Sequence, residues 1–480
     1  SMANKVTNNL GRDSIGKLLF RLAVPSITAQ VVNMLYNIVD RIYIGHIPDI
    51  GATALTGVGV TFPIIMIIAA FSSLIGMGGG PRASICMGQG KYDEAERILG
   101  NCFITLLGIS VVLTAFFLLA AEPLLFLFGA SADTLPYGLS YMNIYVSGTI
   151  FVQMALGLNS FITIQGKAKT SMLTVVIGAV TNIALDPLFI FVFDMGVQGA
   201  AIATIISQAL SSVWVLWFLL GKRTKLKIRR KYLQVRRTVI GPVLALGVSP
   251  FVMQSTESLV NIVLNSSLQW YGGDIAVGAM TILSSLMQVF TLPLTGLTQG
   301  AQPIISFNYG AGNNDRVKKT FRLLITYGFG FACLFWLTVL CFPQAIISLF
   351  TSDLELMGFA SWAVRIYLAA IFMMGAQISC QQTFIAVGQA KISLFLATLR
   401  KVIILIPLVY ILPNFLSDQV FAIFLAEPIA DAVASITTVT IFFLRFKKLL
   451  QNNPNVLKQK DSVSSVRTSD ALPMEKYPPS

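Results

Sequence analysis

The chain has 480 residues, of which 55% are hydrophobic and only 11% are charged, and its mean hydropathy is +0.75. These values exclude an ordinary soluble globular domain, which carries far more charged surface. The net charge of +13 does not by itself indicate nucleic acid, because basic residues beside apolar helices also fix membrane topology. Composition therefore predicts an all-α polytopic membrane protein.

Apolar stretches of about 20 residues, the length needed to cross roughly 30 Å of hydrocarbon, recur along the whole chain. Twelve transmembrane helices are predicted, over residues 17–44, 53–87, 99–120, 138–164, 171–194, 199–220, 240–268, 275–308, 321–341, 358–386, 392–413 and 418–445. The five cysteines form no CxxC pair and lie in or beside these apolar stretches, so neither a disulfide framework nor a metal site is expected.

The sequence contains an internal repeat, in which the second copy lies 222 residues after the first. The repeated positions fall at the end of the second span and after the fourth span of each copy. The matching pairs are Gly78 with Gly300, Pro81 with Pro303, Gly88 with Gly310, Gly90 with Gly312, Gly166 with Gly388, Ala168 with Ala390, Lys169 with Lys391 and Ser171 with Ser393. Two like bundles with a substrate path between them are therefore predicted, as in many transporters.

Four segments are expected: an N-lobe over 1–220, a basic linker over 221–238, a C-lobe over 239–448 and a disordered tail over 449–480. The linker carries nine basic residues and no acid between Lys222 and Arg237. We interpret it as a topology signal lying on anionic lipid headgroups, with specific lipid or nucleic-acid recognition as the alternative. The tail is polar and lacks the apolar residues to build a core.

The sign of the charge alternates from loop to loop along the chain. The first segment, the even-numbered loops and the exit from the last span are basic, whereas the other loops are acidic or nearly neutral. The excess of positive charge on one side predicts that both termini lie in the cytoplasm and that the protein is a multi-pass component of a bacterial plasma membrane.

Acidic residues inside apolar spans are costly and indicate function. Asp40 in the first span and Asp186 in the fifth are predicted to lie at one depth, together with Asn182 and Thr204. Two carboxylates, an amide and a hydroxyl would suit a small cation such as Na⁺, or the two carboxylates would share a proton. The alternative makes Asp40 the partner of Arg41 and Asp186 a helix-end residue.

The second copy does not repeat this group of residues, and its acids are Glu257, Glu427 and Asp431. These acids would line a cavity for cationic substrates or make polar contacts between helices, and the sequence leaves both interpretations open. The other candidate cavity residues are Gln377, Met34 and Met287, since methionine gives an adaptable apolar wall. The intramembrane charges recognised in this way are all acidic.

Five segments carry a resemblance to a known family. They are YNIVDRIYIG (36–45), GMGGGPRASICMGQGKYDEAER (76–97), QGKAKTS (165–171), TNIALDPLFI (181–190) and GAAIAT (199–204). In this order and spacing, and over residues 15–447, the chain resembles the multidrug and toxic compound extrusion (MATE) family. Within that family it is most similar to the bacterial branch of MepA-like and DinF-like exporters.

The resemblance implies twelve helices in two pseudo-symmetric six-helix lobes that form a V, and alternating access driven by inward movement of Na⁺ or H⁺. It implies that Asp40, Asn182, Asp186 and Thr204 bind the coupling ion. Glu257 matches an acid that some relatives use in the C-lobe. The chain departs from those relatives at the tenth span, where they have an Asp and it reads Ser-Cys-Gln-Gln over 379–382.

The function expected from the sequence is cation-coupled antiport that exports organic cations and amphipathic drugs. A lipid-linked precursor flippase or a narrow-substrate metabolite exporter of the same superfamily is the alternative. An enzyme is not expected, because it would need a nucleophile with a base or a metal cluster and the only histidine, His46, lies in a loop. ATP is not expected to drive transport, because no Walker A motif is present. We expect no cofactor and no metal beyond Na⁺ at the four N-lobe residues. The expected partners are small molecules and membrane lipids, not nucleic acid, and the expected state is a monomer.

Overall fold

The computed structural model describes residues 9–128, 130–350 and 353–469, and every regular element within them is a helix. Ten helical stretches of this part of the chain are long and apolar enough to cross a membrane, and two bent helix pairs bring the total to twelve. This confirms the twelve-span, all-α prediction. The two bent pairs are the fourth and tenth spans, with bends of 58° and 48°.

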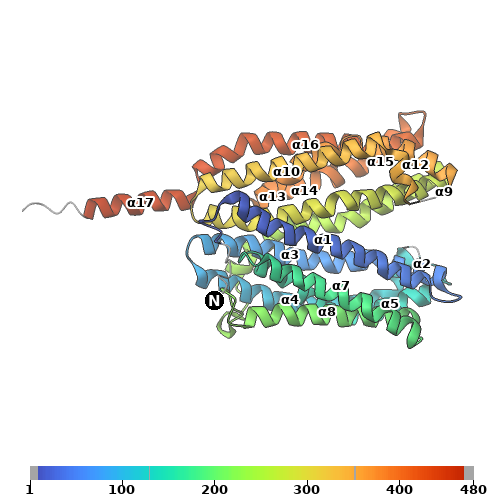
Figure 1. Ribbon diagram of the computed structural model, residues 1–480, viewed down its shortest axis with the longest axis horizontal. Helices are drawn as coiled ribbons and strands as arrows, with labels where there is room; N and C mark the ends of the chain where they lie inside the picture. Colours follow the sequence, from blue (N-terminus) through green and yellow to red (C-terminus); the bar gives the residue numbers. More distant parts are fainter. Residues whose placement is uncertain (1–8, 129, 351–352, 470–480) are drawn as a thin grey trace, which may run out of the picture.

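The first six spans form one lobe, drawn from blue to green in Figure 1. Its helices are α1 (Ile15–Gly45), α2 (Gly51–Val60), α3 (Phe62–Gly88), α4 (Tyr92–Leu127), α5 (Leu135–Ser147), α6 (Thr149–Thr163), α7 (Ala168–Pro187) and α8 (Gly196–Leu220). A π-helical turn, η1 (Leu188–Val192), extends α7 directly after Pro187. Proline has no N–H for an α-helical hydrogen bond, so a change of helix type at this point has a local cause.

The last six spans form the second lobe, drawn from yellow-green to red. Helix α9 (Arg237–Gly310) contains two spans that meet at Gly273, whose φ of 71° breaks the helix. The following elements are α10 (Asn314–Cys341), α11 (Pro343–Ser348), α12 (Leu354–Tyr367), α13 (Ile371–Ala386), α14 (Ala390–Thr398), η3 (Leu399–Leu405), α15 (Ile406–Ile411), η4 (Leu412–Asn414) and α16 (Gln419–Gln451). Here η3 is a π-helix inside the eleventh span.

The sequence duplication reappears in the backbone. Gly90 and Gly312 have φ values of 77° and 74°, and Gly166 and Gly388 have φ values of 77° and 81°. Each pair is separated by 222 positions, and each glycine ends a helix in the left-handed conformation that side chains disfavour. The two copies therefore use the same turns at the same places.

The two lobes pack against each other through α1, α3 and α9. A Cβ on Gly78 would meet the backbone of Val243, and one on Gly300 would meet the backbone of Ala23. The helices approach so closely here because glycine leaves the backbone uncovered. The contacts join parts of the helices that lie towards one end of the molecule.

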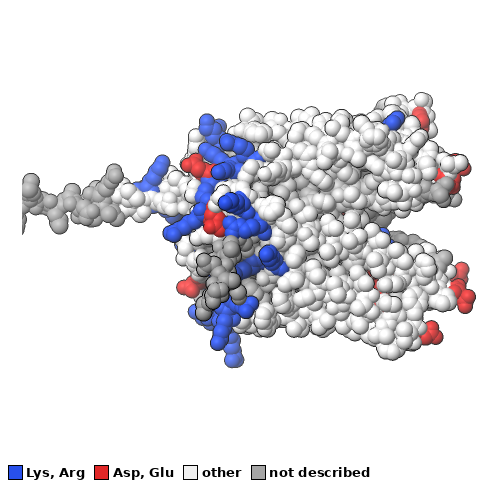
Figure 2. All heavy atoms as spheres, viewed as in Figure 1, with Lys and Arg blue, Asp and Glu red and all other residues white. Residues whose placement is uncertain are grey.

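That end of the molecule is basic. Figure 2 shows lysine and arginine gathered where the C-terminal helix leaves the bundle, and acidic side chains at the opposite end, where a notch separates the lobes. We call these the basic end and the acidic end. The distribution is the one expected of a membrane protein whose charged loops lie on different sides of a bilayer.

The basic linker is held to the first lobe by side chains of that lobe. Glu96 forms an ion pair of 2.6 Å with Arg229, and Asn101 accepts a hydrogen bond of 2.8 Å from the backbone N–H of Arg236. The hydrogen bond to Glu96 and its negative charge raise the pKa of the Arg229 guanidinium. The linker therefore has a defined course over the lobe as well as a charge suited to lipid headgroups.

The tail differs from the expected disorder. Residues 454–469 form the helix α17 (Pro454–Ser469), which projects from the basic end in Figure 1. Its first turn is attached to both lobes: Asn455 accepts a hydrogen bond of 2.6 Å from Gln89 and donates one of 3.1 Å to the carbonyl of Tyr309. Sequence reasoning looked for apolar core residues and did not count these amide contacts. Residues 470–480 of the predicted tail lie outside the described residues.

Candidate functional site

The four N-lobe residues singled out in the sequence lie together. Asp40 is near the end of α1, Asn182 and Asp186 lie one turn apart on α7, and Thr204 is on α8. Since α1 and α7 run side by side and α8 packs on α7, residues separated by up to 164 positions, from 40 to 204, meet inside the lobe. Asn182 and Asp186 are fully buried, whereas Asp40 is partly exposed.

Asn182 links the two carboxylates. Its Nδ2 donates to Asp186 Oδ2 at 2.9 Å and to Asp40 Oδ1 at 3.5 Å, and its Oδ1 accepts from the Thr204 hydroxyl at 3.4 Å. The two carboxyl groups are thus neighbours across one amide nitrogen. The amide therefore sets the spacing of two acidic groups that would otherwise repel.

Three tyrosines close the cluster. Tyr36 on α1 and Tyr141 on α5 lie beside Asp40 and Thr204. The ring of Tyr141 stacks on that of Tyr145 with 6.1 Å between their centroids. Sequence reasoning missed these residues, although the spacing of Tyr141 and Tyr145 by one helical turn places both on one face of α5.

The cluster has oxygen ligands, and no basic residue in the described part of the chain forms an ion pair with it. Asp186 Oδ1 is buried and has no hydrogen-bond partner in the described structure. Arg41 lies over the ring of Phe62 at 5.7 Å, and none of the ion pairs among the described residues joins it to Asp40. Carboxylate, amide and hydroxyl oxygens fit a small hard cation, and two close carboxylates also fit a shared proton.

The C-lobe acids are placed differently, because two basic residues pair with them. Arg400 Nη1 lies 2.8 Å from Glu427 Oε1 and 3.2 Å from Asp431 Oδ1. Lys401 Nζ forms an ion pair with Glu257 and donates to the carbonyl of Met253 at 2.9 Å. Both bases belong to the π-helix η3, and the pairs connect the eleventh span to the seventh and the twelfth.

The expectation that the intramembrane charges are acidic was therefore incomplete. Arg400 and Lys401 are two consecutive bases within an apolar span of 25 residues, and this was a signal that sequence reasoning missed. Glu427 and Asp431 are 1% and 0% exposed, so they do not face a cavity in this conformation. The Glu257 side chain remains 47% exposed.

The other candidate cavity residues lie in several surroundings. Gln377 is buried on α13, and its amide lies 3.5 Å from the Thr438 hydroxyl. Met287 is partly buried against the core of the C-lobe, and Met34 is partly buried on α1. Among the described residues, the side-chain partner of Gln377 is Thr438, so this residue is not joined to the N-lobe cluster.

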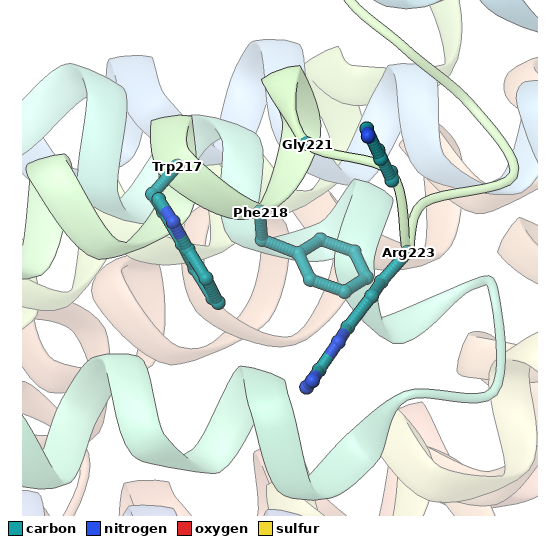
Figure 3. A pocket seen from close by; sticks show the side chains of 5 residues that line it. Trp217, Phe218, Gly221 and Arg223 are labelled. Atoms are coloured by element: carbon teal, nitrogen blue, oxygen red, sulfur yellow. The ribbon is translucent and has the colours of Figure 1, made fainter.

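A surface hollow of about 210 Å³ lies at the basic end of α8, away from both polar clusters. Figure 3 shows Trp217, Phe218 and Arg223 around it. Trp217 is thirteen residues from Thr204, or about 20 Å along the helix. Aromatic and basic side chains of this kind are typical of the membrane interface, so the hollow is not part of the candidate cation site.

The two clusters occupy corresponding parts of the repeats. The N-lobe cluster uses spans one, four, five and six, and the C-lobe cluster uses spans seven, eleven and twelve, with Tyr367 of span ten beside Glu427 and Asp431. Tyr367 matches Tyr145 in the first copy at the same 222-residue displacement. A duplicated twelve-span bundle with polar groups inside each lobe defines the class of membrane transporters built from repeats.

Comparison with known proteins gives the family. The family model MatE matches residues 25–188 and, separately, residues 250–411, so each lobe matches it once. These two segments span more than half of the chain. The chain belongs to the MatE family of transporters, which confirms the resemblance seen in the sequence.

Several relatives have the name multidrug export protein MepA. The protein from Staphylococcus saprophyticus subsp. saprophyticus is 25% identical over 427 residues, covering 88% of this chain and 93% of that protein. The one from Staphylococcus aureus (strain N315) is 23% identical over 427 residues, with the same shares covered. The similarity thus extends over nearly the whole length of both relatives.

Solved structures have the same fold. A crystal structure of MATE in complex with MaL6 has a TM-score of 0.86 and 23% identity, and the match covers 93% of this chain and 100% of that one. A MOP superfamily transporter from Pyrococcus furiosus also has a TM-score of 0.86 and 23% identity, with 94% and 99% covered. These likenesses support the V-shaped MATE fold with two lobes.

Proposed function

We propose that the protein is a secondary antiporter that exports organic cations and amphipathic compounds in exchange for Na⁺ or H⁺. The observation that supports this most directly is the N-lobe cluster, in which Asp40 and Asp186 meet across two helices and have no basic partner among the described residues. Burying such a pair is unfavourable unless a cation or a proton joins it. The cluster is therefore suited to taking up and releasing one positive charge.

Each residue of the cluster has a role in this proposal. Asp40, the more exposed carboxylate, receives the ion from the space between the lobes, and Asp186 holds it in the interior. Asn182 positions both carboxylates, and Thr204 supplies a further oxygen and orients the amide. Neutralising the pair lowers the cost of packing α1 closely against α7, so ion binding favours one arrangement of the lobe over another.

The closed basic end supports alternating access. Gln254 donates a hydrogen bond of 2.8 Å to Ser73 across the lobes, and Phe71 packs edge-on against Phe251 with centroids 4.9 Å apart. If the basic end is cytoplasmic, as the charge distribution favours, this is an outward-facing conformation. In this proposal both termini are cytoplasmic, the membrane is the bacterial plasma membrane and the transporter acts as a monomer.

The substrate class rests on the relatives and on one C-lobe residue. The two MepA relatives are named as multidrug export proteins. In this chain the exposed carboxylate of Glu257 is the acidic group of the C-lobe cluster that an organic cation would meet first. Because Arg400 and Lys401 are each paired with acids, this cluster of the described residues does not offer free positive charge to a lipid phosphate.

The proposal is tested by ethidium accumulation in bacteria that lack their own pumps. Wild type is expected to lower the dye level, and Asp40→Asn is expected to abolish that effect at equal membrane expression. Arg41→Gln is the matched control, because Arg41 is exposed and contacts Phe62 instead of the cluster. Equal dye levels in wild type and empty vector would contradict drug export and favour a flippase or a narrow-substrate exporter.

The coupling ion is identified in proteoliposomes. An imposed Na⁺ gradient or an imposed pH gradient is applied separately, and dye movement is followed in each case. The gradient that drives transport in wild type and fails in Asp186→Asn identifies the ion. Transport that persists unchanged in both Asp40→Asn and Asp186→Asn would show that coupling does not involve this cluster.

A further inference from the structure

A second pair of buried acids lies on α16, in the lobe opposite the candidate coupling site. Glu427 and Asp431 are four residues apart, so their side chains project from the same face of the helix. Their side chains are 1% and 0% exposed. Each carboxyl group contacts the same nitrogen, Nη1 of Arg400, at 2.8 Å from Glu427 and 3.2 Å from Asp431, so the two acids lie side by side. This geometry requires an explanation, since ionised carboxylates repel at such distances.

Arg400 neutralises only one of the two acids. Both carboxylates contact the same nitrogen, Nη1, through one oxygen each. The second oxygens, Glu427 Oε2 and Asp431 Oδ2, are buried and have no hydrogen-bond partner in the described structure. The pair thus lacks one hydrogen-bond donor and one positive charge.

The neighbouring base is already engaged. Lys401 is paired with Glu257 and bonded to the Met253 carbonyl. Among the described residues, the titratable and charged groups around the pair are Arg400, Lys401, Glu257 and Tyr367. The cluster therefore contains three carboxylates and two bases, and one negative charge remains if all three acids are ionised. A net charge at this depth in a membrane protein is strongly unfavourable.

We propose that Glu427 and Asp431 share one proton, which makes them a proton-binding site of the C-lobe. The protonated carboxyl donates a hydrogen bond to its neighbour, and this supplies the donor that the two free oxygens lack. Arg400 then balances the remaining carboxylate, and Lys401 balances Glu257. The whole cluster is electrically neutral in this state.

This site is distinct from the N-lobe cluster and does not depend on the proposed function. It is built on α16 and η3, whereas the N-lobe cluster is built on α1, α7 and α8. Since neither acid is accessible, the proton is retained in this conformation. It can exchange only when the C-lobe rearranges or when Arg400 moves away.

Infrared difference spectroscopy of the purified protein tests the proposal, because a protonated carboxyl group has a C=O stretching band that an ionised one lacks. Wild type is compared with Asp431→Asn and with Glu427→Gln at one pH near neutrality. Each variant leaves a single carboxylate opposite Arg400, so each is expected to lose one carboxylic acid band that shifts in D₂O. Thermal unfolding in detergent identifies a variant that fails to fold, and the second variant then carries the test.

Two further variants separate the outcomes. Arg400→Met removes the base and is expected to increase the intensity of the carboxylic acid band about twofold, because both acids must then be neutral. Asp40→Asn is expected to leave the bands of the C-lobe pair unchanged, whether or not it abolishes drug export. The proposal is overturned if wild type and both α16 variants give the same carboxylic acid bands. A failed dye assay with an intact band would overturn only the proposed function.

Discussion

Gln30 of α1 donates a hydrogen bond of 3.1 Å to Gln299 of α9, across the interface between the two lobes. The two residues lie among the closest contacts between the lobes, where Gly296 and Gly300 of α9 face the backbone of Ile27 and Ala23. The hydrogen bond between these two glutamines can break and re-form at little cost, because both amide side chains can hydrogen-bond to water when the lobes separate. The interface therefore suits a transporter whose lobes move.

The first prediction concerns this interface. Gly247→Ala adds a Cβ that would overlap the backbone oxygen of Leu74, whereas Gly241→Ala on the same helix meets nothing within 4 Å. Gly247→Ala is expected to shift the population towards lobes separated at the basic end, because the closed contact becomes strained. The measurement is the distance distribution between spin labels at Glu94 and Lys318 in a cysteine-free background. Identical distributions for the two variants would contradict the prediction.

The second prediction concerns the hydroxyl of the N-lobe cluster. Thr204→Val removes the donor to Asn182 Oδ1 and the oxygen that faces Tyr36 and Tyr141. Because a buried partner is left unsatisfied, transport is expected to need about tenfold more coupling ion for half-maximal rate. Thr204→Ser retains the hydroxyl and should behave like wild type. The measurement is dye efflux from proteoliposomes over a range of ion concentrations, and equal curves for Val and Ser would disprove the role.

The third prediction concerns the buried ion pairs of the C-lobe. Arg400→Met removes the base that pairs with Glu427 and Asp431. Removing one partner of a buried ion pair typically lowers the free energy of unfolding by about 3–5 kcal/mol. Proton uptake by the acids will reduce this loss at low pH. Arg365→Met, on the exposed side of α12, should change it by less than about 1 kcal/mol. Thermal unfolding in detergent at two pH values checks both statements.

The fourth prediction concerns the linker. Glu96→Gln removes the ion pair with Arg229 and weakens the contact with the backbone N–H of Lys227. Residues 227–236 should then be cut by trypsin several-fold faster, because the segment separates more often from the lobe. Glu94→Gln changes an exposed acid of the same helix turn and is the matched control. Equal cleavage rates for the two variants would mean that other contacts hold the linker.

The fifth prediction concerns the turn that both repeats share. Gly90 has a φ of 77° and open space around its Cα, so Gly90→Ala introduces backbone strain without a steric contact. The free energy of unfolding is expected to fall by about 1 kcal/mol. Gly16→Ala also meets open space but lies in a helix, and it should be neutral or slightly stabilising. A pair of thermal unfolding curves decides between these outcomes.

Much of the fold could be predicted because its causes are local. A membrane span needs a run of apolar residues, and the repeat was visible in glycines such as Gly90 and Gly312 that end helices in the same way. The N-lobe residues were also within reach, because Asp40 and Asp186 are rare acids in apolar spans and Asn182 lies one helical turn from Asp186. Their use in ion coupling stays a prediction.

The partners of the C-lobe acids could not be predicted from the sequence. The sequence shows that Arg400 and Lys401 are basic residues in an apolar span. Which acid each contacts depends on the rotation of η3 against α9 and α16. The π-helix changes that rotation by altering the angle between successive residues. The helix after Pro454 was missed for a related reason, since its attachment uses amide side chains from both lobes.

The sequence by itself determined the class of protein, the twelve spans, the duplication and the rare acids, because hydrophobic length and desolvation cost depend on residues that are close in the chain. Only the tertiary structure decided that Asp40 meets Asp186 through Asn182, that the lobes are closed at the basic end and that Arg400 faces two acids. These features depend on how separate helices are turned and packed against one another, and a contact between distant residues leaves no periodic pattern in either helix.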